Sequence, residues 1–189
     1  MDFGPVFEKD LERCQAMPLG TEPLGISAQI DFPSLSLEKA FSGVKIANQS
    51  AAKACLSGYY LLFNALDRSH SISQKLDTAE GSFWHAIMHR REGDYWNSKY
   101  WFKQFSHHPI YNDLLAGAQL VISSEKSGKL KKILSSRSWD AGLYVDLVEE
   151  CCAKDSSLAG KCQQIQALEW QLLFSYCFNL AITNSRKNI

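Results

Sequence analysis

The sequence has neither a long hydrophobic run nor an excess of charge of one sign. No stretch of 18 consecutive apolar residues occurs, which argues against a membrane-spanning helix. The 20 basic and 20 acidic residues balance, so the basic surplus typical of nucleic-acid binders is missing. Residues 1–5 lack the basic start and apolar core of a signal peptide. We therefore expect a cytoplasmic protein that has neither nucleic acid nor membrane as a partner.

Motifs of several common enzyme classes are missing as well. Neither G-x-G-x-x-G nor G-x-x-x-x-G-K-[ST] occurs, which argues against a dinucleotide-binding or P-loop enzyme. Covalent catalysis has no candidate, because there is no G-x-S-x-G elbow and no cysteine in the histidine-containing segment. The six cysteines include no C-x-x-C pair, so we expect most of them to be small buried hydrophobic residues of a reduced protein.

The chain does contain enough apolar residues for one core. It has 189 residues, of which 46% are hydrophobic, and this length fits a single domain over 1–189. Apolar residues recur at spacings of three and four, and no strand-like alternation stands out. We predict an all-α bundle of six or seven helices with a long irregular N-terminal loop over 17–33. The expected helices are 2–16, a short turn ending at Phe41, 48–66, 79–91, 95–106, 109–122, 139–153 and 158–182, followed by a frayed tail over 184–189.

Helix-terminating residues define the middle of the chain most clearly. Thr78 is a suitable N-cap for a helix over 79–91, and Gly93 suits its C-terminal end. Asp94 can cap the next helix, and Pro109 fits the first turn of the one after it. Gly58, inside the helix predicted for 48–66, indicates a close crossing with another helix.

All five histidines lie between residues 70 and 108. On a helix, His85, His89 and Glu92 share one face, because residues at i, i+4 and i+7 are neighbours. Two imidazoles and a carboxylate are candidate ligands for iron, zinc or manganese. The pattern is not H-E-x-x-H, since Ala86 stands in the place of the glutamate.

A metal site would need a ligand from elsewhere in the chain, and His70, His108 and Asp67 are the candidates. His107 is excluded if His108 faces inward, since adjacent residues cannot both face one site from a helix. Without a metal, His70, His85 or His89 could act as a general base near neutral pH. The alternative is that these histidines are half-buried residues that hydrogen-bond to their neighbours.

Charged and aromatic residues follow the histidines directly. Arginine guanidinium groups suit carboxylate or phosphate ligands, and aromatic side chains can form the walls of a small-molecule pocket. The same charges also suit helix ends and internal ion pairs, and a helix that is aromatic on many sides is usually core. The candidate ligand-binding residues are Arg90, Arg91, Asp94, Asn97 and Lys99.

This segment resembles a group of uncharacterised microbial proteins. Residues 80–95 read EGSFWHAIMHRREGDY, and the signature continues through NSKYWF at 97–102 to His108-Pro109. The Asp67…His70…Gln74 segment belongs to the same signature, so the resemblance covers about 45 of the 189 residues. No activity is established for that group, so the resemblance implies no role for any residue.

Two functions remain open on the sequence alone. The first is a helical protein with a histidine, arginine and aromatic pocket that binds a small polar or anionic molecule, and that acts, if it is an enzyme, as a metal-assisted hydrolase or oxidase. The second is a non-enzymatic scaffold or interaction module, in which the histidine segment is a structural polar network.

Overall fold

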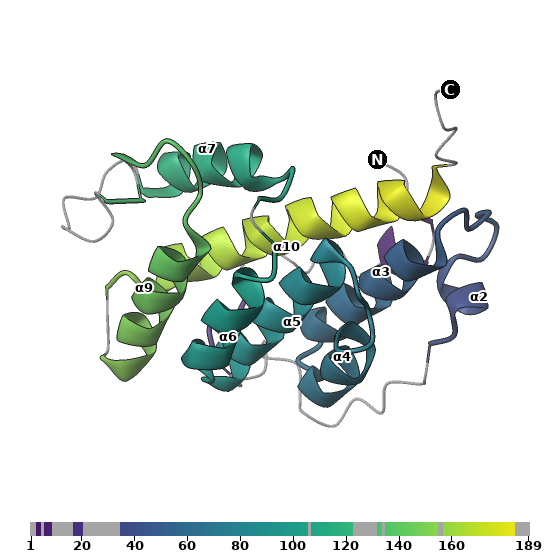
Figure 1. Ribbon diagram of the computed structural model, residues 1–189, viewed down its shortest axis with the longest axis horizontal. Helices are drawn as coiled ribbons and strands as arrows, with labels where there is room; N and C mark the ends of the chain where they lie inside the picture. The colour runs from purple at the N-terminus through teal and green to yellow at the C-terminus, as the bar shows by residue number, and fades with distance from the viewer. Residues whose placement is uncertain are drawn as a thin grey trace.

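The computed structural model describes residues 3–4, 6–8, 17–20, 35–105, 107–122, 132–133, 135–154 and 157–183. These residues form helices and no strand, which confirms the all-α prediction (Figure 1). The helices are α2 (Leu37–Ala40), α3 (Gln49–Leu62), α4 (Leu66–Ser73), α5 (Ala79–Glu92), α6 (Tyr95–Phe102), α7 (Tyr111–Ile122), α9 (Ala141–Ala153) and α10 (Ala159–Ile182). Most of the predicted helix 2–16, most of the loop 17–33 and the tail 184–189 lie outside the described residues.

Helix α10 is the longest helix and organises the bundle. Figure 1 shows it running the length of the molecule, with α3 and α5 on one side and α7 on the other. Its buried face includes Ile165, Trp170, Phe174 and Phe178, and the rings of Trp170 and Phe174 stack at 4.8 Å. No helix among the described residues is long and apolar enough to cross a membrane.

Helices α3, α5 and α10 approach closely at Gly58. A Cβ atom at this position would lie 2.6 Å from the indole ring of Trp84, so only glycine fits without movement. The indole N–H of Trp170 donates to the carbonyl oxygen of Gly58 at 2.7 Å. The close crossing predicted at Gly58 is therefore confirmed.

The predicted boundaries of α5 and the predicted start of α6 are also confirmed, whereas α6 ends at Phe102 and not at residue 106. The Thr78 hydroxyl accepts from the Gly81 N–H at 3.1 Å, and Gly93 ends α5 with a φ of 87°. Asp94 caps α6 by accepting from the Asn97 N–H at 3.1 Å. Because only two residues separate α5 from α6, the helices form a tight hairpin, and the Ser98 hydroxyl donates to the Ala86 carbonyl within it.

Helix α4 lies in a segment that is not among the helices expected from the sequence. Its buried face is built from small serines, and the hydroxyls of Ser57 on α3 and Ser69 on α4 are 2.8 Å apart. Serines at such a contact let two helices approach closely while each hydroxyl keeps a hydrogen-bond partner. Helix α4 thereby packs against both α3 and α5 and presents His70 toward α5.

Candidate functional site

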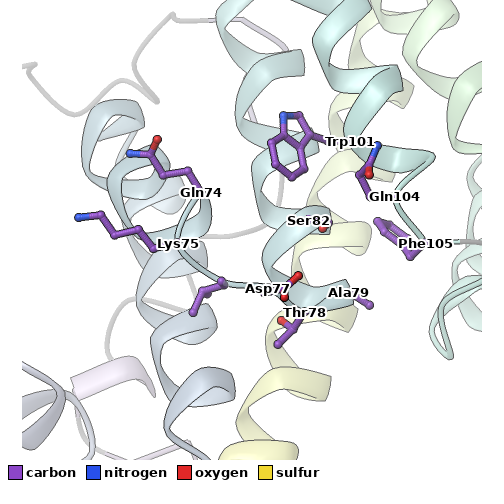
Figure 2. A pocket seen from close by; sticks show the side chains of 10 residues that line it. Gln74, Lys75, Asp77, Thr78, Ala79, Ser82, Trp101, Gln104 and Phe105 are labelled. Carbon is purple, nitrogen blue, oxygen red and sulfur yellow. The ribbon is translucent and has the colours of Figure 1, made fainter.

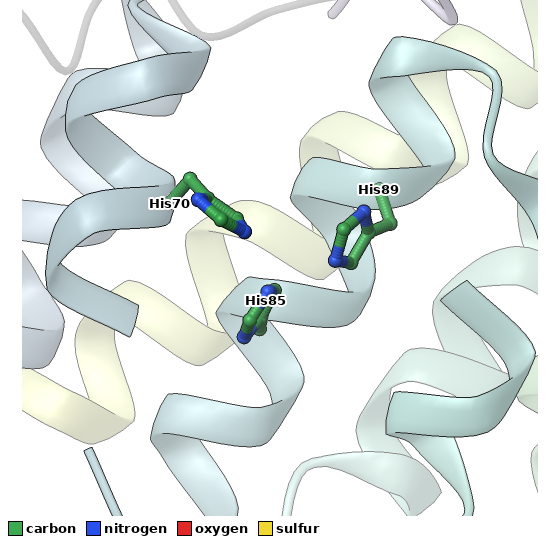
Figure 3. Close-up of side chains that lie close together, drawn as sticks. All are labelled: His70, His85 and His89. Carbon is green, nitrogen blue, oxygen red and sulfur yellow. The ribbon is translucent and has the colours of Figure 1, made fainter. Parts of the chain in front are cut away.

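Three histidines from two helices converge between α4 and α5. His70 comes from α4, whereas His85 and His89 lie one turn apart on α5. One ring nitrogen from each lies within 4.8 Å of the other two, and Figure 3 shows His70 directed across toward the other rings. The ring centroids are separated by 4.7 Å for His70–His85, 5.5 Å for His70–His89 and 4.6 Å for His85–His89. We call these residues the three-histidine site.

His85 is the most unusual member of the three-histidine site. The residue is 3% exposed, and neither ring nitrogen has a hydrogen-bond partner among the described residues. Its ring stacks on His89 and, at 4.1 Å, on Trp101. Burial, followed by the proximity of His89 and His70, lowers the pKa of His85 to about 3. His85 is therefore a neutral imidazole with an available lone pair, in a place where unsatisfied polar atoms are costly.

His89 is held by a carboxylate and an amide. Glu92 Oε1 lies 2.6 Å from Nδ1 of His89, and Asn97 Nδ2 lies 3.1 Å from Nε2. A carboxylate at Nδ1 favours the tautomer that is protonated there, which leaves the Nε2 lone pair as the acceptor. This is the arrangement in which metal-binding histidines are commonly held.

The position of Glu92 differs from that expected for a third ligand on the same stripe. His70, rather than Glu92, completes the group that contains both His85 and His89. Glu92 belongs to a second group with His89 and Asp94, and both carboxylates are exposed. Glu92 does lie on the same face of α5 as His89, as the spacing predicts. Its carboxylate, however, contacts the ring of His89, three positions earlier, at 2.6 Å.

His108 does not join the three-histidine site. It is fully buried, with its ring 4.9 Å from that of Tyr176, and its Nδ1 accepts from the Ile110 N–H at 3.4 Å. Its Nε2 lies 3.9 Å from Glu80 Oε1. Burial, followed by the charge of His107, lowers the pKa of His108 to about 4. His107 itself is exposed.

The two arginines predicted to grip a ligand point into the protein. Arg90 is fully buried, donates to both carboxylate oxygens of Glu169 on α10, and donates to Gln166 Oε1 at 3.0 Å. Arg91 is 1% exposed and donates to the Leu61 carbonyl at 3.0 Å. These bonds tie α5 to α10 and to the end of α3, so both arginines act as structural residues of the core.

The remaining predicted ligand-binding residues are placed separately. Asp94 is the N-cap of α6, and Lys99 forms an ion pair with Asp146 at 2.7 Å. Of the five residues predicted to bind a ligand, only Asn97 contacts a histidine ring of the three-histidine site by a hydrogen bond that the described part of the chain shows, whereas Asp94 reaches His89 only through its backbone N–H, which donates to the His89 carbonyl. Asp67, the other outlying candidate, is exposed.

Sequence reasoning missed two residues that shape this region. Trp101 is one of the aromatic residues for which the sequence left core and pocket wall open, and it stacks directly on His85. Glu169 neutralises Arg90, and the signal for it is an isolated acidic residue in the apolar run of α10.

An open groove of about 420 Å³ shares Trp101 with the surroundings of the three-histidine site. Figure 2 shows the side chains that line this groove. It runs between the end of α4, the start of α5 and the end of α6. Its lining includes Gln74, Ser82, Trp101, Gln104 and Phe105. Trp101 connects the groove to the site, because its indole also packs on His85.

Comparison of the chain with protein-family models, with curated proteins and with solved structures found no match. The fold and the site therefore define the protein only as an all-α bundle with an interhelical three-histidine cluster. Its function has to be argued from the geometry.

Proposed function

We propose that the protein binds a divalent transition metal ion through His70, His85 and His89, and that it is a metal-dependent hydrolase. The observation that carries this proposal is the state of His85. A buried imidazole without a hydrogen-bond partner, whose nitrogen converges with those of two other histidines, would gain the missing interaction from a metal ion.

The chemistry of the ligands favours zinc and hydrolysis. Three imidazoles with an open fourth position are typical of zinc sites that activate water, whereas non-haem iron oxygenases commonly use two histidines and a carboxylate. The nearest carboxylate, that of Glu92, contacts the ring of His89 instead. A bound zinc ion would lower the pKa of its water to about 7 and so supply a nucleophile at neutral pH.

The neighbours of His89 support the same proposal. Glu92 at Nδ1 orients the ring and increases its basicity, so that Nε2 can serve as the ligand atom. Asn97 Nδ2 is within hydrogen-bond distance of that same nitrogen. Its amide would have to turn away from Nε2 when a metal binds.

A scaffold function is the second candidate, and one observation favours it. His89 already has partners at both ring nitrogens, as expected for a structural polar network. On this alternative the protein binds no metal, and the network only joins α5 to α6.

We further propose that the protein works in the cytoplasm. The cysteines among the described residues are free thiols, as expected in a reducing compartment. Cys151 and Cys162 form no disulfide, and their thiols instead make a hydrogen bond at 3.6 Å.

Equilibrium dialysis of metal-free protein against zinc, iron(II) or manganese(II), followed by elemental analysis, tests the metal proposal. We expect one equivalent of zinc in the wild type and at least a 100-fold weaker affinity in His70→Ala and His89→Ala. His70 is only partly buried, so His70→Ala is the variant least at risk of unfolding. His107→Ala is the matched control, because His107 is an exposed histidine outside the site.

Each result separates the two functions. Stoichiometric zinc that is lost in His70→Ala but kept in His107→Ala supports the metal site. The metal site is overturned if the wild type binds none of the three metals, or if His70→Ala and His107→Ala bind zinc equally well. Either result leaves the scaffold function. Preferential binding of iron(II) would overturn the assignment to zinc and favour an oxidase.

A further inference from the structure

The groove is formed in part by the same two helices, α4 and α5, that carry the three-histidine site. Ser82 precedes His85 by three positions on α5, and Gln74 follows His70 by four positions at the end of α4. Residues at these spacings lie on the same face of a helix. The groove therefore begins one helical turn from the histidines, and Trp101 borders both.

The groove is uncharged overall. Its charged lining residues are Lys75 and Asp77, which have opposite signs and are both exposed. No arginine lines it, because Arg90 and Arg91 point into the core. A phosphate or a polycarboxylate is usually held by several cationic groups, so this groove is poorly suited to a strongly anionic ligand.

The polar groups of the groove suit a planar ligand that both donates and accepts hydrogen bonds. Gln74 and Gln104 each carry a carbonyl and an amino group, and Ser82 adds a hydroxyl. The amino group of Gln104 already donates to the Tyr100 carbonyl at 3.1 Å, which leaves its carbonyl oxygen as an acceptor. Trp101 and Phe105 supply flat apolar walls against which a ring can pack.

We propose that the groove binds a small, uncharged, planar molecule that carries an amide or ureide group, for example within a nitrogen heterocycle. The volume of about 420 Å³ lies in the usual range for small-molecule sites. The reaction of this ligand rests on the proposed metal function. A water activated by a metal ion held by His70, His85 and His89 would add through its oxygen to the ligand carbonyl carbon, the carbon–nitrogen bond would break, and one proton of the water would pass to the leaving nitrogen.

Ligand-observed NMR with hydantoin, uracil and orotate tests the groove directly. Orotate is a uracil that carries a carboxylate, so it isolates the effect of charge. In metal-free protein we expect hydantoin or uracil to bind, and orotate to bind at least 10-fold more weakly. Trp101→Ala and Gln104→Ala should each reduce binding at least five-fold. Trp96→Ala is the matched control, because Trp96 is a 75% exposed tryptophan on the same helix and outside the groove.

Removing Trp101 could also disturb His85, on which it packs. Gln104→Ala tests the groove independently of that contact. The absence of binding by every probe, equal binding of orotate and uracil, or equal effects of Trp96→Ala and Trp101→Ala would overturn the proposal. A second measurement uses protein loaded with manganese(II). Strong paramagnetic relaxation of the bound probe supports a groove that opens beside the metal, and unchanged relaxation of a bound probe overturns that placement.

The proposed groove ligand and the proposed metal site can be refuted separately. Zinc binding without probe binding overturns the groove ligand and leaves the metal function standing. Probe binding to protein that takes up no metal overturns the hydrolase, while the groove remains a binding site for the same class of molecule.

Discussion

The buried ion pair between Arg90 and Glu169 gives the sharpest prediction about stability. Both side chains are fully buried, and the guanidinium also donates to Gln166 and lies 4.7 Å from the ring centroid of Tyr144. Burial lowers the pKa of Arg90, but the charge and hydrogen bonds of Glu169, together with the nearby Tyr144 and Cys162, offset burial and raise the pKa overall. The arginine therefore remains charged, and Glu169 forms its buried ion pair.

Replacing that partner by Glu169→Gln leaves a buried cation without a counter-charge. Breaking a buried pair on one side costs about 3–5 kcal/mol. Since glutamine keeps one acceptor for the guanidinium, we expect the lower end, about 3 kcal/mol. For a chain of this size each kcal/mol corresponds to about 2–4 °C, so Tm should fall by roughly 6–12 °C.

Urea denaturation and thermal unfolding measure this loss. The matched control is Asp146→Asn, which removes the carboxylate from the partly exposed pair with Lys99. An exposed pair contributes about 1 kcal/mol or less, so the control should lose little stability. If Glu169→Gln loses no more than Asp146→Asn, the assignment of Arg90 to a structural role is wrong.

Three further predictions concern pH, the metal site and packing. Because burial lowers the pKa of His108 to about 4, protons bind the unfolded chain preferentially below its ordinary pKa of 6.5, and stability should fall as pH falls. The contribution of His108 that is lost between pH 7.5 and 5 is about 2 kcal/mol. His85, whose pKa is also lowered, adds a loss of its own, so the loss in His108→Leu should be about 2 kcal/mol smaller than in the wild type when urea denaturation is compared at both pH values. Glu92→Gln should weaken zinc binding about 10–100-fold in a competition titration, and an unchanged affinity contradicts the orienting role. Gly58→Ala should lower the free energy of unfolding by about 1–3 kcal/mol, because the added methyl group would clash with Trp84. Gly160→Ala is the control: it has open space around it and should be neutral or stabilising by up to about 1 kcal/mol. Equal effects of the two substitutions in urea denaturation would contradict the packing argument.

The local part of the fold could be predicted because it depends on neighbouring residues. The Thr78 and Asp94 caps and the left-handed Gly93 are determined within one turn of chain, and the structure shows each of them. Helix α4 was missed because its segment is mostly polar. It is stabilised by the contact of Ser69 with Ser57, and that contact exists only after α3 and α4 have packed.

The candidate site could be predicted only in part, for the same reason. The spacing of His85 and His89 follows from one helix, and His70 was identified as a candidate from elsewhere in the chain. Its approach to them depends on how α4 packs against α5, which no periodicity encodes. The burial of Arg90 likewise depends on its pairing with Glu169, a residue 79 positions away in the sequence.

The most direct test of the metal proposal is anomalous diffraction at the zinc absorption edge from crystals of zinc-loaded protein. The proposal predicts one strong peak, about 2.0–2.1 Å from one nitrogen each of His70, His85 and His89. A peak coordinated by Glu92 and Asp94 instead, or no peak between α4 and α5, would contradict it.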